Sequence, residues 1–225
     1  PASKLRFMPH EKLAHYAKAA VDIEYEFPDG FDEVEGIHNR QDFDLGSHTK
    51  AQSEFDIKAT VETNKDSTTK LSYSDPQSGI SFIPYVVETA MGVNRCMLAI
   101  MHHAYTDEDL GDGKSRIVLK LKPALSPVKA AVIPLARNVP ELVGMADDIV
   151  ADLRKMGIGR IEMENSGNIG KNYRRHDEIG TPVCITVDHQ SLTDRMVTLR
   201  HRDSMEQERI SIDDVRSRLL EIVNS

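Results

Sequence analysis

The stretch PYVVETAMGVNRCMLAIMHHAY, residues 84–105, decides the fold of the first part of this chain. It opens with a β-branched apolar run that carries one carboxylate, Glu88, and this pattern predicts a buried strand. After Gly92 the apolar residues follow a helical spacing, which places Arg95 on the first helical turn. One face of the expected helix carries the apolar side chains of Met97, Leu98, Met101 and Ala104. The stretch therefore predicts a strand–turn–helix unit with an acid at the end of the strand and an arginine at the start of the helix.

Composition limits the class of protein. The 225 residues are 40% hydrophobic and 28% charged, which is typical of a globular protein. No run of about 18 apolar residues occurs, so no membrane partner is expected. Two cysteines form neither a disulfide framework nor a zinc cluster, and they fit a reducing cytosol. The net charge is -8, so a nucleic-acid site would need a local basic patch.

The first half is expected to contain short elements of mixed type. The patterns predict a helix at 9–20, strands at 21–27 and 31–37, a polar segment of loop or weak strand at 50–80, and a strand at 80–88. Residues 28–30, Pro-Asp-Gly, are a turn signal, so the strands before and after it should form an antiparallel hairpin. The acidic, glycine-bearing segment at 106–116 is the best candidate for a linker.

The second half shows a regular alternation of elements. Strands are expected at 129–136, 159–165, 182–188, 196–203 and 208–212, and helices at 138–157, 169–180 and 213–223. In the first helix Asn138 is the expected cap, Pro140 suits an early helical position and Gly157 can end it. This order predicts a mixed five-stranded sheet flanked by three helices.

Several charged groups are candidates for a binding site, each with an ordinary structural alternative. Glu88 at the end of an apolar strand needs a positive partner, which is either a ligand ammonium or Arg95 in an internal salt bridge. A second candidate group has Glu33 and Glu35 on one face of a strand, with Arg40 after Gly36. Its alternative is that these charged residues are simply solvated on a half-exposed strand.

A basic group in the second half is the other candidate. It combines positive charge with one aromatic ring, as a surface for single-stranded RNA bases would, or it is a solvated helix face. Its members are Lys171, Tyr173, Arg174 and Arg175. Arg200, His201 and Arg202 on a strand are similarly ambiguous, and the nine histidines show no metal-ligand spacing.

Long segments of the chain resemble class II glycyl-tRNA synthetases of the dimeric type. The matching segments in the first half are GFDEVEGIHNRQDFDLGSHTK at 30–50 and the motif 3 region at 82–105. In the second half, LKLKPALSPVKAAVIPL, SGNIGKNYRRHDEIGTPVCITVD and VTLRHRDSMEQERI resemble the anticodon-binding domain of that family. The implied fold is α/β: a partial class II catalytic domain on an antiparallel sheet, followed by a mixed five-stranded anticodon-binding domain. The implied limits are 1–110 for the catalytic part, 111–126 for a linker and 127–225 for the anticodon-binding domain.

The resemblance also implies a role for each site residue. Glu88 would bind the glycine ammonium, Arg40 the amino-acid carboxylate or adenylate, and Arg95 the ATP adenine or phosphates; these three are the implied catalytic residues. The implied ATP-binding residues are Glu33, Val34, Glu88, Thr89, Ala90, Met91 and Arg95. The implied glycine-binding residues are Arg40, Tyr85, Glu88 and Ala90. The implied anticodon contacts are Lys171, Tyr173, Arg174 and Arg175.

The implied reaction is attack of the glycine carboxylate on the ATP α-phosphate, followed by glycyl transfer to tRNA(Gly). Such catalysis rests on positioning and charge stabilisation. ATP with Mg²⁺ is the implied cofactor, with no protein metal motif. Glycine and tRNA(Gly) are the implied partners, in a full-length homodimer in the cytoplasm. The alternative is a non-catalytic nucleic-acid-binding accessory protein on the same scaffold.

Two departures from the family pattern bear on activity. The family reads Glu-x-Ser-x-Gly where this chain has Glu88-Thr89-Ala90-Met91-Gly92, and one lost neutral hydrogen bond costs roughly 0.5–1.5 kcal/mol. Motifs 1 and 2 of class II enzymes are not found, and the chain does not begin with Met. We therefore expect a C-terminal fragment that is inactive by itself.

Overall fold

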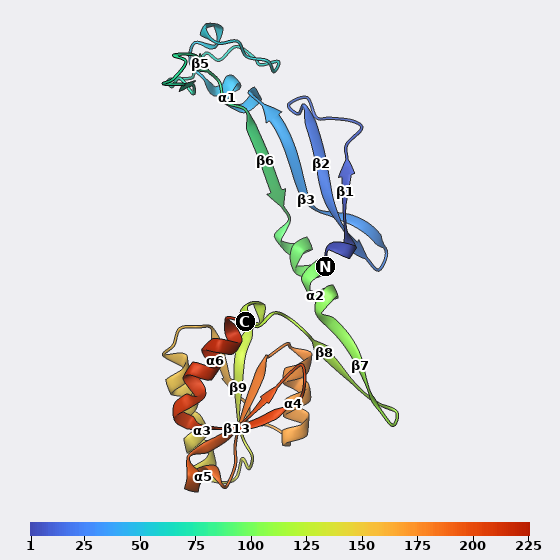
Figure 1. The fold of residues 1–225 in the computed structure, drawn as a ribbon, viewed down its shortest axis with the longest axis vertical. Coiled ribbons are helices and arrows are strands. Elements are labelled where there is room, and N and C mark those ends of the chain that lie inside the picture. The colour runs from blue at the N-terminus through green and yellow to red at the C-terminus, as the bar shows by residue number, and fades with distance from the viewer. The chain divides into compact units, whose positions relative to one another are not determined.

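The computed structural model describes all residues, Pro1–Ser225. The chain divides into two compact units, Pro1–Ala99 and Ile100–Ser225, and each is described by itself (Figure 1). No helix is both long enough and apolar enough to cross a membrane.

The first unit is built on a four-stranded antiparallel sheet in the order β1-β2-β3-β6 (Figure 1). Its strands are β1 (Leu5–Pro9), β2 (Ala19–Phe27), β3 (Gly30–Gln41) and β6 (Val86–Met91). The expected hairpin between the second and third strands is confirmed. Gly30 closes its turn with a φ of +128°, which residues with a Cβ rarely adopt.

The helix expected at 9–20 is wrong. Pro9 ends β1, and the following residues form an exposed loop that leads into β2. The loop is held at its ends by main-chain bonds, from His10 N to Ala20 O at 3.0 Å and from Lys18 N to Asn39 O at 2.8 Å. A helix of about 12 residues is marginal in water unless its apolar face is buried. Most side chains of this loop are exposed, and only Tyr16 and Ala17 are half-buried.

The strand expected at 80–88 is interrupted. Residues Ser81–Phe82 form β5, which pairs with β4 (Tyr73–Ser74), and the chain resumes as β6 only at Val86. Pro84 lies in the gap and has no N–H to donate to a ladder. β6 is also an edge strand, so it is not buried as expected: Val87 is 63% exposed.

Polar side chains organise the segment between β3 and β6. The carboxylate of Asp42, itself buried, accepts hydrogen bonds from Lys58 N at 2.7 Å and Ala59 N at 2.8 Å. Asn64 donates to Ser47 O at 2.6 Å. The short helices here are α1 (Phe43–His48) and the 3-10 turn η2 (Gln52–Glu54). The loop expected at 50–80 is thus largely confirmed, with side-chain-to-backbone bonds in place of an apolar core.

The helix expected from residues 91–105 is confirmed as α2 (Val93–Ala104). In the first unit, Cys96 and Ala99 pack against a small core of Tyr25, Phe27 and Val34. The expected apolar face of α2 is only partly covered, because Met97 is 57% exposed and Leu98 is 56% exposed.

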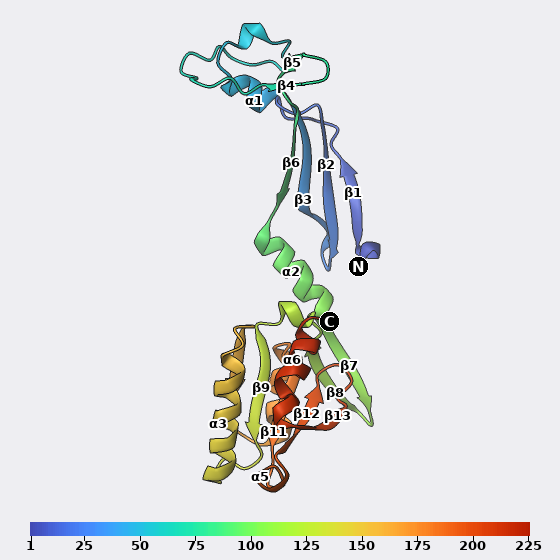
Figure 2. The ribbon, with the colours of Figure 1, turned by 60° about the vertical axis from the view of Figure 1, so that its left-hand side comes forward.

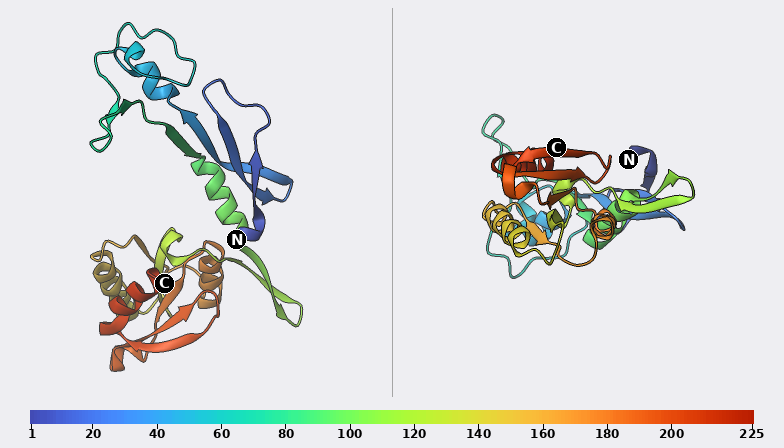
Figure 3. Two further views of the ribbon diagram at one scale, coloured as in Figure 1. Left: turned by 45° about the horizontal axis from the view of Figure 1, so that its top comes forward. Right: turned by 90° about the horizontal axis from the view of Figure 1, so that it is seen from below.

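A hairpin occupies much of the segment expected to be a linker. It consists of β7 (Tyr105–Gly111) and β8 (Lys114–Leu119), followed by the 3-10 turn η3 (Pro123–Leu125). The two-residue turn Asp112–Gly113 has positive φ at both positions, as turns of tight hairpins require. In Figure 3 the hairpin projects beside the five-stranded sheet of the second unit.

The five-stranded mixed sheet expected in the second half is confirmed, in the order β10-β9-β11-β12-β13. The strands are β9 (Val128–Pro134), β10 (Arg160–Met163), β11 (Val183–Val187), β12 (Met196–His201) and β13 (Gln207–Ser211). β10 and β11 both run parallel to β9, which lies between them. β12 is antiparallel to β11, and β13 is antiparallel to β12. The helices are α3 (Pro140–Arg154), α4 (Ile169–Glu178), the short α5 (Ser191–Asp194) and α6 (Val215–Val223).

The helices of the second unit cover both faces of the sheet, with α4 on one side (Figure 1) and α3 and α6 on the other (Figures 1 and 2). α3 and α6 pack on one face through Leu142, Ile149 and Leu219, among others. α4 packs on the opposite face through Ile169 and Tyr173.

The expected Asn138 cap of α3 is wrong, since Val139 holds the cap position without a side-chain bond. Asn168 does cap α4, accepting from Lys171 N at 3.0 Å.

Candidate functional site

Arg40 and Glu88 meet at a bulge in β3. The register with β6 pairs Asn39 with Val87 and Gln41 with Val86, so Arg40 has no partner in this ladder. A bulge of this kind changes the direction of a side chain. Arg40 Nη1 donates to Glu88 Oε2 at 2.6 Å, and the two side chains are 19% and 39% exposed.

Two further groups hold the Arg40 guanidinium. Arg40 Nε and Nη2 donate to the two carboxylate oxygens of Asp44 at 2.7 and 2.8 Å. The guanidinium carbon lies 3.9 Å from the ring centre of Tyr16. The bond to Asp44 is the main cause that raises the pKa of Arg40, and the same bond lowers the pKa of Asp44. Sequence reasoning missed both supporting residues, although the four-residue spacing of Arg40 and Asp44 is a usable signal.

Arg95 does not pair with Glu88, so the salt-bridge alternative is wrong. Arg95 Nη1 donates to Glu33 O at 2.6 Å and lies 3.5 Å from Asp32 Oδ1. The start of α2 is tied to the same strand, because Gly92 N donates to Val34 O at 3.3 Å. Arg95 therefore lies against β3, with its side chain 44% exposed.

A second bulge in β3 lies at Val34. The register with β2 moves from Ile23–Glu35 to Glu24–Glu33, which leaves Val34 unpaired. Val34 is buried in the small core and Glu33 is exposed, which agrees with the expected opposite faces for these two residues; a common face for Glu33 and Glu35 stays a prediction.

The other residues implied for ATP and glycine lie along the adjacent edge. Ala90 is opposite Gly36, Thr89 opposite Ile37 and Met91 opposite Glu35. Tyr85 precedes β6 and is 49% exposed. Gly36 provides room here, since a Cβ at this position would lie 3.0 Å from His38.

The basic group on α4 is bonded largely within the protein. Arg175 Nη1 donates to Glu164 at 2.7 Å, and Arg174 Nη1 donates to Asp177 at 3.2 Å. Tyr173 is half-buried, with its hydroxyl 2.7 Å from Thr186 Oγ1. Lys171 is exposed.

Asp177 is a buried acid surrounded by arginines, and sequence reasoning missed it. Arg200 donates to both of its oxygens at 2.8 and 3.0 Å, and also lies over the Tyr173 ring at 4.7 Å. Arg116 from the hairpin donates to it at 3.1 Å. Buried charges of this kind must be paired. Arg200 is therefore structural, and so is Arg202, which donates to Gly180 O and Leu121 O.

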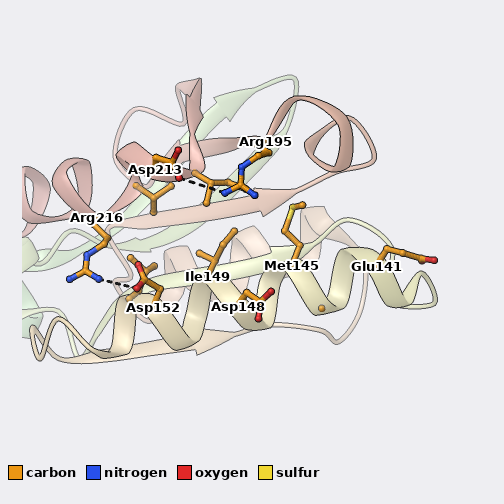
Figure 4. Close-up of a pocket in the computed structure, with 12 residues that line it drawn as sticks. Glu141, Met145, Asp148, Ile149, Asp152, Arg195, Asp213 and Arg216 are labelled. Carbon is orange, nitrogen blue, oxygen red and sulfur yellow. Dashed lines mark hydrogen bonds and ion pairs between the residues drawn. The ribbon is translucent and has the colours of Figure 1, made fainter.

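A groove of about 740 Å³ lies between α3 and the segment around η4 (Ile212–Asp214) (Figure 4). Its arginines are paired, Arg216 with Asp152 at 2.9 Å and Arg195 with Asp213 at 3.6 Å. None of the basic residues of α4 lines it. The groove is therefore separate from the expected anticodon contacts.

The structure contains no group of three or more His, Cys, Asp or Glu residues that could hold a metal ion. Burial raises the pKa of the Cys184 thiol to about 12, so this thiol remains protonated.

Comparison with known proteins agrees with the fold. Residues 129–222 match the family described as "Anticodon binding domain". A glycine–tRNA ligase of Thermus thermophilus is 52% identical over 222 residues, which cover 95% of this chain and 44% of that protein. A glycine–tRNA ligase of Deinococcus radiodurans is 49% identical, covering 96% and 45%. One from Borreliella burgdorferi is 47% identical, covering 98% and 47%.

The antiparallel sheet with its following helix, together with the anticodon-binding domain, is the arrangement of a class II aminoacyl-tRNA synthetase. Within that class, the chain corresponds to a C-terminal region of the glycyl-tRNA synthetases, to which it is about half identical over nearly its whole length. It spans somewhat less than half the length of the curated relatives that it matches.

Proposed function

We propose that the protein containing this chain activates glycine with ATP and transfers it to tRNA(Gly). The observation that carries this proposal is the placement of Arg40, Glu88 and Arg95 around two adjacent strands, in a chain about half identical to glycine–tRNA ligases. The accessory-protein alternative is not favoured, because the relatives are named as glycine–tRNA ligases.

In the proposed site, charge complementarity selects the amino acid. Glu88 accepts the glycine ammonium and Arg40 donates to its carboxylate, while Tyr85 and Ala90 border the same strand. Arg95 offers an exposed guanidinium to the nucleotide, since arginine suits both phosphate and the face of a base. The remaining proposed ATP contacts are Glu33, Val34, Thr89 and Met91.

ATP supplies the adenylyl group that activates the carboxylate: the glycine carboxylate attacks the α-phosphate, and pyrophosphate leaves. We propose Mg²⁺ as the ion that accompanies ATP, bound through the nucleotide phosphates. We assign residues 1–110 to the catalytic part and 127–225 to the anticodon-binding part. A cytoplasmic homodimer is the proposed form of the full-length protein.

For the anticodon, we propose Lys171, Tyr173, Arg174 and Arg175 of α4 as contacts. The intramolecular bonds of Tyr173, Arg174 and Arg175 give these three side chains defined positions, which reduces the entropy lost on binding.

The test is binding of this chain to a glycine tRNA and to the same tRNA with a changed anticodon, at one fixed salt concentration. We expect at least about tenfold tighter binding to the correct anticodon, which corresponds to ~1.4 kcal/mol. Lys171→Glu should weaken binding. Lys155→Glu is the matched control, because Lys155 is also exposed and is the C-cap of a different helix, α3.

Equal affinity for both tRNAs, or equally tight binding to duplex DNA, would argue against this function. Equal weakening by the two lysine substitutions would show a general charge effect and remove α4 from the proposed interface.

A further inference from the structure

Arg40 is held on three sides by residues from three different segments. Asp44 comes from the first turn of α1, Tyr16 from the loop between β1 and β2, and Glu88 from β6. The loop itself is tied to β3 next to Arg40 by the bond from Lys18 N to Asn39 O.

The contacts differ in kind. The two parallel bonds to Asp44 fix both the plane and the direction of the guanidinium, as a fork-shaped donor on a carboxylate does. The Tyr16 ring covers one face of that plane. Glu88 receives a single bond, from Nη1, and it is the more exposed of the two charged partners, at 39% against 31% for Asp44.

The local charge balance follows from this arrangement. Arg40 brings one positive charge, and Asp44 and Glu88 bring two negative charges. Because Asp44 already neutralises the guanidinium, the carboxylate of Glu88 still attracts a second cation. Without Asp44, Arg40 and Glu88 would form a closed neutral pair.

We propose that Asp44 and Tyr16 are positioning residues for the amino-acid site: they fix the Arg40 guanidinium so that its Nη1 edge can pass from Glu88 to a ligand carboxylate while Glu88 accepts the ligand ammonium. This inference rests on the proposed function and adds two residues to it. Arg40 and Glu88 then pair with each other in the free protein. When a zwitterionic amino acid binds, its carboxylate replaces Glu88 as the partner of Arg40, and its ammonium replaces Arg40 as the partner of Glu88.

The experiment is glycine-dependent pyrophosphate exchange in the full-length protein, with thermal melting as a check on folding. Asp44→Asn should raise the KM for glycine by about ten- to a hundredfold, the effect of losing a hydrogen bond to a charged group. The KM for ATP and the melting temperature should stay unchanged. Asp44→Glu should restore part of the glycine affinity, because it restores the charge.

Tyr16 provides an independent pair of variants. Tyr16→Leu removes the ring over the guanidinium and should raise the KM for glycine, whereas Tyr16→Phe keeps the ring and should behave like the wild type. Asp56→Asn is the control for loss of an acid, since Asp56 is 84% exposed and pairs with Lys58 alone. If Asp44→Asn fails to fold, the comparison of the two Tyr16 variants decides.

The outcomes separate the two proposals. A wild-type protein without glycine-dependent exchange overturns the proposed function. An active wild type whose glycine KM is unaffected by Asp44→Asn and Tyr16→Leu overturns this inference. A parallel change in both KM values and in the melting temperature also overturns it, because that pattern indicates a structural role.

Discussion

At the scale of single residues, backbone geometry decides which side chains reach the site. Arg40 reaches Glu88 because it occupies a bulge in β3, and Gly36 leaves room beside His38. Two other glycines differ in their backbone conformation and in the space available for a Cβ. Gly180 follows α4 with a φ of +79°, and a Cβ there would lie 3.0 Å from Leu119 O. Gly144 lies inside α3, with open space where a Cβ would be.

Alanine at these two glycines should change stability in opposite directions. Gly180→Ala should lower the free energy of unfolding by about 1–3 kcal/mol, because it combines a left-handed backbone with a clash against main chain. Gly144→Ala should raise it by roughly 0.5–1 kcal/mol, because alanine is the better helix former. Urea unfolding followed by circular dichroism measures both. A Gly180→Ala variant as stable as Gly144→Ala would contradict the reasoning.

At the scale of elements, one buried arginine joins the β7–β8 hairpin to the rest of the second unit. The Arg116 side chain is fully buried and donates to Glu108 at 2.5 Å and to Asp177 at 3.1 Å. It also donates to Arg202 O at 2.8 Å and to Asp203 O at 3.0 Å. The hairpin is thus an integral part of the unit, although its sequence has the composition of a linker.

Removing this arginine should separate the hairpin from α4. Arg116→Met should lower the free energy of unfolding by about 3 kcal/mol, since losing one partner leaves buried polar groups uncompensated. Limited proteolysis at the turn at 111–114 should also become faster. Arg216→Met is the control, because the half-exposed pair with Asp152 contributes about 0–1 kcal/mol. Equal losses from the two substitutions would show that burial of Arg116 is unimportant.

At the scale of the whole molecule, the two units bury apolar surface very differently. The second unit has a core drawn from strands on both sides of β11 and from α3 and α6. The buried apolar core cluster of the first unit is small, and apolar side chains such as Phe7 and Val93 are 71% and 80% exposed. Because local stability follows buried apolar contacts, the units should open with different free energies.

Hydrogen exchange on the intact chain tests this difference. The amides of β9 and β11 should exchange most slowly, because every residue of these strands is buried. The amides of β1, in which every residue is exposed, should exchange at least about tenfold faster, a difference of ~1.4 kcal/mol in opening free energy. Equal protection in the two sheets would show that the chain opens as one cooperative unit.

Local patterns predicted the second unit better than the first. Its strands and helices have long periodic segments and glycines that mark helix ends, so propensity and packing agree there. In the first unit the amphipathic pattern at 9–20 had no apolar surface to cover, and Pro84 interrupted an apolar run that looked continuous. The composition at 106–116 did not reveal that Arg116 would be buried.

The sequence by itself determined the family, the strand–turn–helix at residues 84–105 and the alternation of elements in the second unit, because these depend on neighbours a few residues apart. Only the tertiary structure decided which charges pair. Arg40 and Glu88 are 48 positions apart, and Arg95 and Glu33 are 62 apart. Their distances depend on the register and the bulges of β3, which local pattern does not specify.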